Sequence, residues 1–126
     1  MYKNLLFFGL SKSKFKRLKL RFDLVNKTQI HHIIPIQFKN YSCLRNLNID
    51  DGCNLMLLPN KKGASILNTT RPVHQGPHHM YNSMVRRELD KLEEKKMTQD
   101  ITDFHVSKLI LQLRQKIRHN QVRFNK

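Results

Sequence analysis

Hydrophobic residues recur three or four positions apart in two runs, at Tyr81, Val85, Leu89 and Leu92 and again at Val106, Ile110, Leu113 and Ile117. This spacing places side chains on one face of an α-helix. Charged residues between the hydrophobic positions face water on the other side. Thr98, Gln99 and Asp100 supply capping residues for the second run. The C-terminal half therefore predicts two amphipathic helices, the second over about residues 100–120.

Shorter hydrophobic runs nearer the N-terminus predict strands. Residues 30–34 are rich in isoleucine, and residues 53–58 form a second apolar run; a proline follows each. We expect these runs to pair as a hairpin. Asparagine, aspartate and glycine in residues 36–53 predict an irregular connection between the strands, with one helical turn near Leu44–Leu47.

Other segments have weaker patterns. Leu18, Leu20, Phe22 and Leu24 alternate with charged residues, which predicts a half-buried strand, although Phe15, Leu18, Phe22 and Val25 also fit one helical face. Lys61-Lys62-Gly63 predicts a basic turn, and residues 64–73 have no clear period. With 126 residues, 39% of them hydrophobic, the chain has room for one domain. We place it at 18–122, between a basic N-terminal arm (1–17) and a basic tail (123–126).

The charge balance points to a polyanionic partner. Twenty-four Lys and Arg against nine Asp and Glu give a formal net charge of +15, which favours nucleic acid or an anionic membrane surface. No apolar run has the length of a membrane span, and residues 5–10 are too short for a signal-peptide core. Cys43 and Cys53 are too far apart for a four-cysteine zinc module, so we expect reduced thiols and a reducing compartment, the cytoplasm or nucleus.

The histidines carry the candidate chemistry. His31 and His32 are adjacent in a predicted strand, where neighbouring side chains point to opposite faces, so one could hold a metal while the other addresses a substrate. His74 and His78 are four apart, which places both rings on one side of a helical turn. Gly76-Pro77 predicts that the helix begins between them. His79 is a rival to His78 but lacks this spacing.

Three blocks carry a resemblance to a known family. They read His-His-Ile-Ile-Pro at 31–35, Asn-x-x-x-Leu-Pro at 54–59, and His-x-Gly-x-His-x-x-Tyr-Asn at 74–82. Over about residues 28–92 the chain resembles the AHH family, a branch of the HNH/endonuclease VII superfamily of nucleases. Ile30 stands where that family usually has a small alanine, a change that alters packing beside the site and removes no chemical group.

The resemblance implies the site and the fold. It implies that His31, His74 and His78 bind one divalent metal ion, that His32 is the general base, and that Asn54 is the central asparagine of the superfamily. An all-imidazole set independently suits zinc or another transition metal such as nickel or manganese, with magnesium as an alternative. The implied fold is α+β, with a ββα-metal (His-Me finger) core of two strands and a helix around one ion. A C-terminal helix and the basic N-terminal segment extend this core.

The expected function is metal-dependent endonucleolytic hydrolysis of nucleic acid with low sequence specificity, DNA being favoured over RNA by analogy. Phosphate contacts are expected from dispersed basic residues near the motif blocks: Lys61, Lys62, Arg71, Arg86 and Arg87. An inhibitor or immunity protein is a further candidate partner. The alternatives are a non-catalytic nucleic-acid-binding protein with a structural metal site, and a basic membrane-active protein that binds lipid through residues 1–22.

Overall fold

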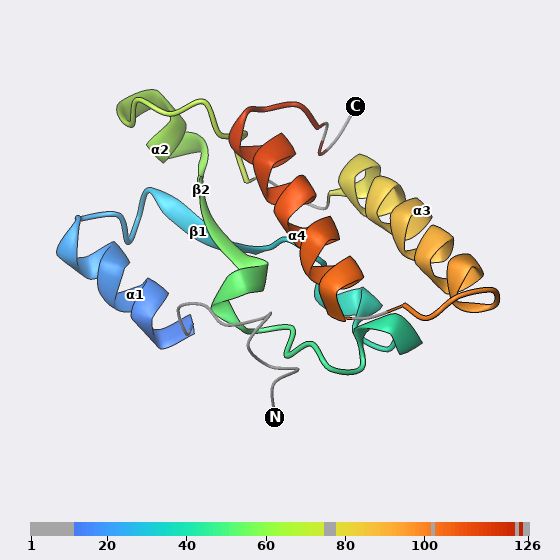
Figure 1. The fold of residues 1–126 in the computed structure, drawn as a ribbon. Coiled ribbons are helices and arrows are strands. Elements are labelled where there is room, and N and C mark those ends of the chain that lie inside the picture. The colour runs from blue at the N-terminus through green and yellow to red at the C-terminus, as the bar shows by residue number, and fades with distance from the viewer. Residues whose placement is uncertain (1–11, 75–77, 102, 123, 125–126) are drawn as a thin grey trace.

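A two-stranded sheet lies among helices in an α+β arrangement (Figure 1). The computed structural model describes residues 12–74, 78–101, 103–122 and 124. Within these residues the strands are β1 (Thr28–His32) and β2 (Leu55–Pro59), and the α-helices are α1 (Lys12–Arg21), α2 (Lys61–Ile66), α3 (His79–Lys96) and α4 (Asp103–Arg118). The predicted mixed fold class is confirmed at this level.

The predicted hairpin forms, with bounds shifted by about two residues. β1 and β2 are antiparallel, with Thr28 opposite Pro59, His31 opposite Met56 and His32 opposite Leu55. The ladder ends at His32 because the chain turns there. The backbone N–H of Ile33 donates to the Asn54 carbonyl at 2.7 Å, and the next residue bonds the Asn54 side chain instead of a strand.

The connection between the strands contains three short 3-10 helices, η2 (Ile36–Phe38), η3 (Ser42–Leu44) and η4 (Gly52–Asn54). A turn lies where one was predicted, because Leu47 N–H donates to the Leu44 carbonyl at 2.9 Å directly after η3, but the prediction of a single helical turn was wrong in number. The connection is bonded to both long helices. Tyr41 donates its hydroxyl to Asp90 of α3 at 2.7 Å, and Asn46 donates its side-chain amide to Asp103 of α4 at 3.0 Å. These bonds hold an irregular segment against the helical layer.

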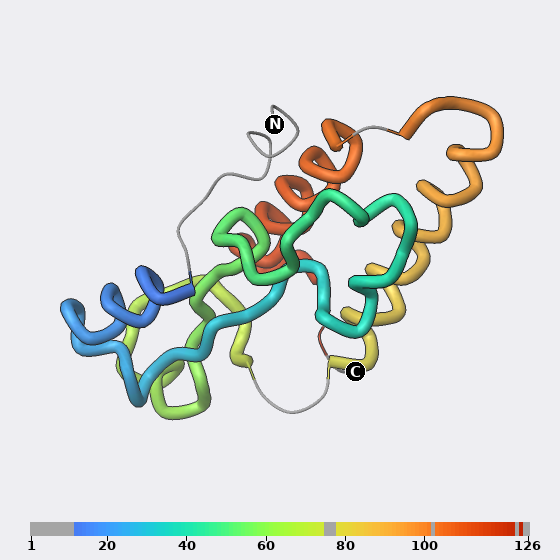
Figure 2. The backbone as a smooth tube through the Cα atoms, turned by 90° about the horizontal axis from the view of Figure 1, so that it is seen from below, coloured from blue at the N-terminus to red at the C-terminus, as the bar shows by residue number. Residues whose placement is uncertain are grey.

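Helices α3 and α4 run in opposite directions (Figures 1 and 2). Their apolar faces form much of the core. Both predicted faces are confirmed: Tyr81, Val85 and Leu89 of α3 and Val106, Ile110, Leu113 and Ile117 of α4 are buried, with Leu92 partly buried at the edge. Ile33, Ile34, Met56 and Leu58 meet these faces from the hairpin side. The hairpin is therefore fixed relative to the start of α3, where the candidate site lies.

Residues 12–21 form a helix, so the strand predicted over 18–24 was wrong. The helical alternative is correct for Phe15 and Leu18, but Phe22 and Val25 lie beyond the helix and are exposed. α1 buries none of its residues. Its end is a left-handed cap: Asp23 has φ 55°, Leu24 N–H donates to the Lys19 carbonyl, and Asp23 N–H donates to the Leu20 carbonyl. Lys19 Nζ also donates to the Thr28 carbonyl at 2.9 Å, which attaches α1 to β1. The helix runs across the predicted boundary at residue 17.

The basic turn predicted at residues 61–63 is instead the first turn of α2. Asn60 caps this helix, since its side-chain oxygen accepts from Gly63 N–H at 2.7 Å. Gly63 is buried because the helix lies against Lys27, and a β-carbon at Gly63 would overlap the Lys27 carbonyl. Residues 64–66, which were expected to be irregular, also belong to α2, whereas residues 67–73 have no regular structure, as expected.

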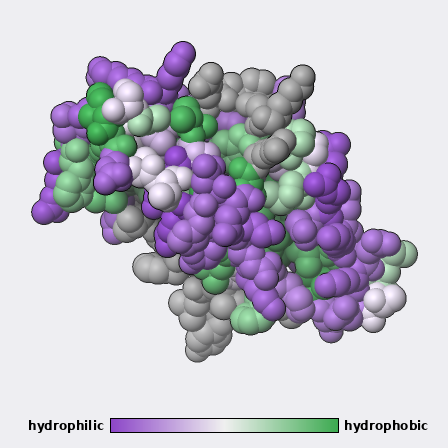
Figure 3. Space-filling model, turned by 90° about the horizontal axis from the view of Figure 1, so that it is seen from above, coloured by the Kyte–Doolittle hydropathy of each residue, from purple (hydrophilic) through white to green (hydrophobic). Residues whose placement is uncertain are grey.

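Cys43 and Cys53 are free thiols, as predicted. Burial raises the pKa of each to about 12, so both stay protonated near neutral pH. No helix in the described part of the chain is long and apolar enough to cross a membrane. Hydrophilic side chains cover most of the face seen in Figure 3, with small hydrophobic patches between them.

Candidate active site

Three imidazoles from separate parts of the chain meet beside β1. His31 lies in β1, His74 follows α2, and His78 immediately precedes α3. One ring nitrogen from each lies within 4.8 Å of the other two. Nε2 of His74 and Nε2 of His78 are 3.1 Å apart, and the His31 ring centroid is 5.3 Å and 5.5 Å from the other two ring centroids. This cluster of three histidines could hold a metal ion.

Backbone contacts hold the three rings in place. His74 N–H donates to the Pro59 carbonyl at 2.7 Å, which ties it to the end of β2. His78 occupies the N-cap position of α3, one residue before the first turn. A helix that begins at Gly76-Pro77, as predicted, would have placed His78 within that turn. Gly76 and Pro77, the predicted helix entry, lie outside the described residues.

The aromatic rings of Tyr81 and Phe124 pack against the cluster. The His31 ring lies 5.2 Å from the rings of both Tyr81 and Phe124, centroid to centroid, and the Phe124 carbonyl accepts from Met80 N–H at 2.9 Å. Phe124 thereby joins the site and the start of α3, although sequence analysis had assigned it to a basic tail. A single phenylalanine after a helix carries no pattern that could have revealed this role.

The three imidazole rings of the cluster are uncharged near neutral pH. Burial lowers the pKa of His31 to about 3, with His74, His78 and His32 adding to the shift, and burial with the neighbouring His78 lowers that of His74 to about 4. Burial also lowers the pKa of His78. Near neutral pH all three rings therefore offer lone pairs.

The cluster also leaves polar atoms unsatisfied. His31 is 3% exposed, and neither His31 Nε2 nor His78 Nδ1 has a hydrogen-bond partner among the described residues. Buried polar atoms normally have partners, so orphaned nitrogens in a polar cluster call for an explanation. A divalent ion bound by imidazole nitrogens satisfies such atoms. The residues present therefore fit a metal ion.

His32 lies apart from the cluster, as the alternation of a strand requires. Its Nε2 atom is 2.7 Å from Oδ1 of Asp50, in the connection between the strands. His79 is an exposed first residue of α3 and does not belong to the three-histidine cluster. Sequence analysis missed Asp50, since Asp50-Asp51-Gly52 has the composition of an ordinary turn.

Asn54 is fully buried and makes three hydrogen bonds to backbone groups. Its Oδ1 accepts from Ile34 N–H at 2.7 Å, and its Nδ2 donates to the carbonyls of Ile34 and Ile49 at 3.0 Å each. Tyr81 donates its hydroxyl to the Ile33 carbonyl. These two side chains fix the backbone that directly follows His31 and His32.

The predicted phosphate-binding residues differ in exposure. Lys61, Lys62, Arg86 and Arg87 are exposed, and Arg86 lies 5.5 Å from the centroid of the Phe38 ring. Arg71 is partly buried and donates from Nη1 to the Leu57 carbonyl at 2.7 Å. Burial and the neighbouring Arg118 lower the pKa of Arg71. One nitrogen of Arg71 is thus already used in fixing β2.

The fold and the histidine cluster define a small α+β protein with a candidate metal site. Comparison with family models extends this description: residues 16–117 match AHH, a nuclease family of the HNH/ENDO VII superfamily with conserved AHH. The chain belongs to this family, and the match is wider than the motif blocks at 28–92. No curated protein and no solved structure matches the chain.

Proposed function

We propose that the protein is a metal-dependent endonuclease that hydrolyses phosphodiester bonds of nucleic acid, DNA in preference to RNA. The observation that carries the proposal is the convergence of His31, His74 and His78, in a chain that belongs to a nuclease family. Three protein ligands leave coordination positions for substrate and water. We further propose that β1, β2 and the start of α3 form a ββα-metal core around one ion.

A bound divalent ion would offset charge on the phosphate and on the leaving oxygen. His31, His74 and His78 would hold it, and their neutral rings favour zinc or another transition metal, such as nickel or manganese, over magnesium. Their burial against Tyr81 and Phe124 limits the geometries that the site can adopt.

His32 is proposed as the general base. It lies next to His31 in the sequence but projects from the other side of β1, so it can face an attacking water without binding the ion. In the proposed step, the water oxygen bonds to phosphorus and its proton passes to the His32 ring. The bond from phosphorus to the leaving oxygen breaks, and that oxygen takes a proton from solvent. Asn54 supports the step by holding the backbone after His32.

Substrate grip is proposed to come from exposed cations that bind backbone phosphate, which gives affinity without reading base identity. Lys61, Lys62, Arg86 and Arg87 are available for this role, and Arg71 has only part of its guanidinium to offer. α1 adds six cations in ten residues, none of them buried. Low sequence specificity is the expected consequence.

The test is cleavage of supercoiled plasmid and of single-stranded RNA by the full chain, with zinc, nickel, manganese or magnesium and with a chelator. We expect nicking with at least one metal, none with the chelator, and loss of cleavage in His32→Ala. His79→Ala, with an exposed histidine outside the cluster, serves as the matched control and should cut like the wild type. Tight binding without cleavage would instead support the non-catalytic alternative.

A further inference from the structure

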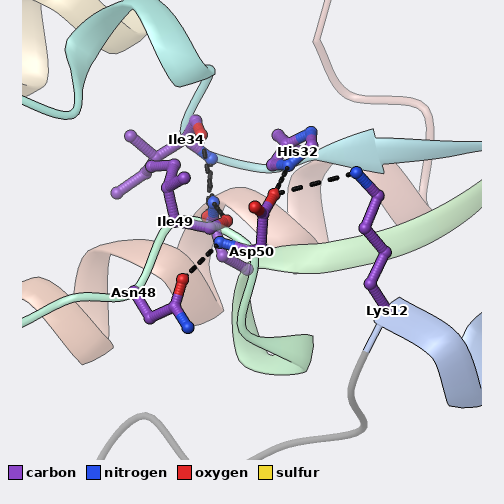
Figure 4. A network of polar contacts seen from close by, with 7 residues as sticks. Lys12, His32, Ile34, Asn48, Ile49 and Asp50 are labelled. Atoms are coloured by element: carbon purple, nitrogen blue, oxygen red, sulfur yellow. Dashed lines mark hydrogen bonds and ion pairs between the residues drawn. The ribbon is translucent and has the colours of Figure 1, made fainter.

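A carboxylate from outside the three motif blocks contacts the ring of His32. Figure 4 shows Asp50 directed at His32, with Oδ1 2.7 Å from Nε2. The His32 side chain is only 15% exposed, whereas that of Asp50 is 49% exposed. The carboxylate is therefore the more exposed partner of the contact, and the His32 ring is the more enclosed one.

The proton in this contact can be assigned. An ionised carboxylate only accepts hydrogen bonds, so the hydrogen must be on His32 Nε2. A neutral imidazole carries one hydrogen, which leaves a lone pair on Nδ1. The contact thus selects one tautomer and holds the ring in one orientation. It presents Nδ1, rather than Nε2, as the atom able to accept a proton.

Asp50 is itself held in place by the connection between the strands. Its backbone N–H donates to Oδ1 of Asn48 at 3.1 Å. The preceding residue, Ile49, is bonded through its carbonyl to Nδ2 of Asn54 at 3.0 Å. The same Asn54 amide binds Ile34, two residues after His32. The buried Asn54 side chain therefore joins the segment that carries His32 to the segment that carries Asp50.

The competing interpretation is that Asp50 is an ordinary surface acid paired with Lys12. That pair is 4.0 Å apart between two half-exposed side chains, a geometry that contributes little. The bond to His32 is shorter and better enclosed. It is also the main cause that holds the pKa of Asp50 below its ordinary value, with Lys12 adding less. The observations favour His32 as the partner that matters.

We propose that Asp50 is a positioning residue for His32: its carboxylate accepts from Nε2–H and aims the lone pair of Nδ1 at the attacking water, and Asn54 acts through this contact. The catalytic effect of Asp50 rests on the proposed function. The Asp50–His32 contact is independent of that function, so the contact and the catalytic effect can be tested separately.

The first test is NMR of the full chain at about pH 8, loaded with zinc and also metal-free. Spectra that correlate ring protons with ring nitrogens distinguish protonated from unprotonated nitrogen. We expect the His32 proton on Nε2, protected from exchange with water, and Nδ1 unprotonated. In Asp50→Ala this protection should be lost. A proton on Nδ1, or an unchanged Nε2–H signal in the variant, would overturn the proposal.

The second test is kinetic. Asp50→Ala should lower kcat about 10- to 100-fold, the usual cost of losing an orienting partner, with KM changed less than about twofold. Asp50→Asn keeps an acceptor oxygen and should recover part of the loss. Asp100→Asn, an exposed acid between α3 and α4, is the charge-matched control and should behave like the wild type. A loss confined to KM would indicate substrate binding and reject the positioning role.

The outcomes separate the two proposals. If His32→Ala abolishes cleavage while Asp50→Ala cuts normally, the endonuclease assignment stands and the role of Asp50 is refuted. If no metal supports cleavage in the wild type, the proposed function fails, and the NMR result still decides whether Asp50 orients His32. Zinc binding should be equal in wild type and Asp50→Ala, because Asp50 is not part of the three-histidine cluster.

Discussion

Adjacent histidines in a strand point to opposite faces of the sheet, so His31 and His32 have different partners. His31 is buried and meets the partly buried His74 and His78, whereas His32 contacts Asp50. Alternation, read from the sequence, was enough to predict the separation. The resemblance also named His74 and His78 as the partners of His31. Asp50, the partner of His32, was not predicted, because it reaches the strand through a contact between distant segments.

Removing one ring of the cluster should greatly weaken metal binding. His31→Ala deletes a nitrogen that lies within 4.8 Å of the ligand atoms of both other histidines. Loss of an outer partner of a ligand costs about 10- to 100-fold in affinity, so loss of a ligand should cost more than about 100-fold. Calorimetric titration with zinc measures this. His79→Ala is the control and should bind like the wild type; an equal loss in both variants would contradict the assignment.

Asn54 should contribute strongly to stability as well. Asn54→Ala leaves the buried amide of Ile34 and the carbonyls of Ile34 and Ile49 without their partner. Unsatisfied buried groups cost about 1–3 kcal/mol each, and partial relaxation suggests about 3 kcal/mol in total. Urea unfolding of the metal-free chain gives the value. Asn68→Ala, at an exposed position, should change stability by less than about 0.5 kcal/mol. Equal effects of the two variants would argue against this role.

At the scale of elements, the two long helices and the hairpin were predictable, whereas the shorter helices α1 and α2 were not. α3 and α4 have sustained apolar faces, and both were found with their buried residues. α1 has ten residues and none buried, so period two and period 3.6 fit its few apolar positions equally well. It also ends on Asp23 in a left-handed conformation, where glycine is the usual signal.

α2 was missed because its glycine looked like a turn residue. The better signal was Asn60, which caps the helix three residues before Gly63. Gly63 serves close packing, since the helix backbone approaches Lys27 where no side chain would fit. The residue that breaks the helical pattern in the sequence is therefore the one that allows the helix to reach the hairpin.

This packing makes Gly63→Ala a test at the same scale. The added methyl group would overlap the Lys27 carbonyl, and backbone atoms cannot rotate away as a side-chain end can. We expect a loss of about 2 kcal/mol in the free energy of unfolding, despite the better helix propensity of alanine. Thermal and urea unfolding measure it. Ser65→Ala in the same helix should stay within about 0.5 kcal/mol. A neutral or stabilising Gly63→Ala would show that α2 does not pack this closely.

At the scale of the whole molecule, a net charge of +15 predicts binding to nucleic acid that depends strongly on salt. With a chelator present to prevent cleavage, affinity for a short DNA duplex should fall at least about 100-fold between about 50 and 200 mM salt. Fluorescence anisotropy measures this. Replacing Lys61 and Lys62 with alanine should lower the salt slope by about two, whereas arginine at both positions should preserve it. A salt-independent affinity would contradict phosphate binding.

The whole fold is needed to assemble the site. β1 supplies His31, the end of β2 holds His74 through the Pro59 carbonyl, and α3 begins beside His78. Phe124, near the other end of the chain, lies against His31, His78 and the start of α3. The motif blocks named the histidines from the sequence, but only the packing of hairpin and helices explains why their nitrogens meet.

The most direct test is a crystal structure of the full chain grown with zinc, with the ion located by its anomalous scattering. We predict one ion about 2.0–2.1 Å from a nitrogen of each of His31, His74 and His78, with water completing its shell and His32 turned towards Asp50. An ion bound elsewhere, or one that leaves His31 out while His32 takes its place, would contradict the account.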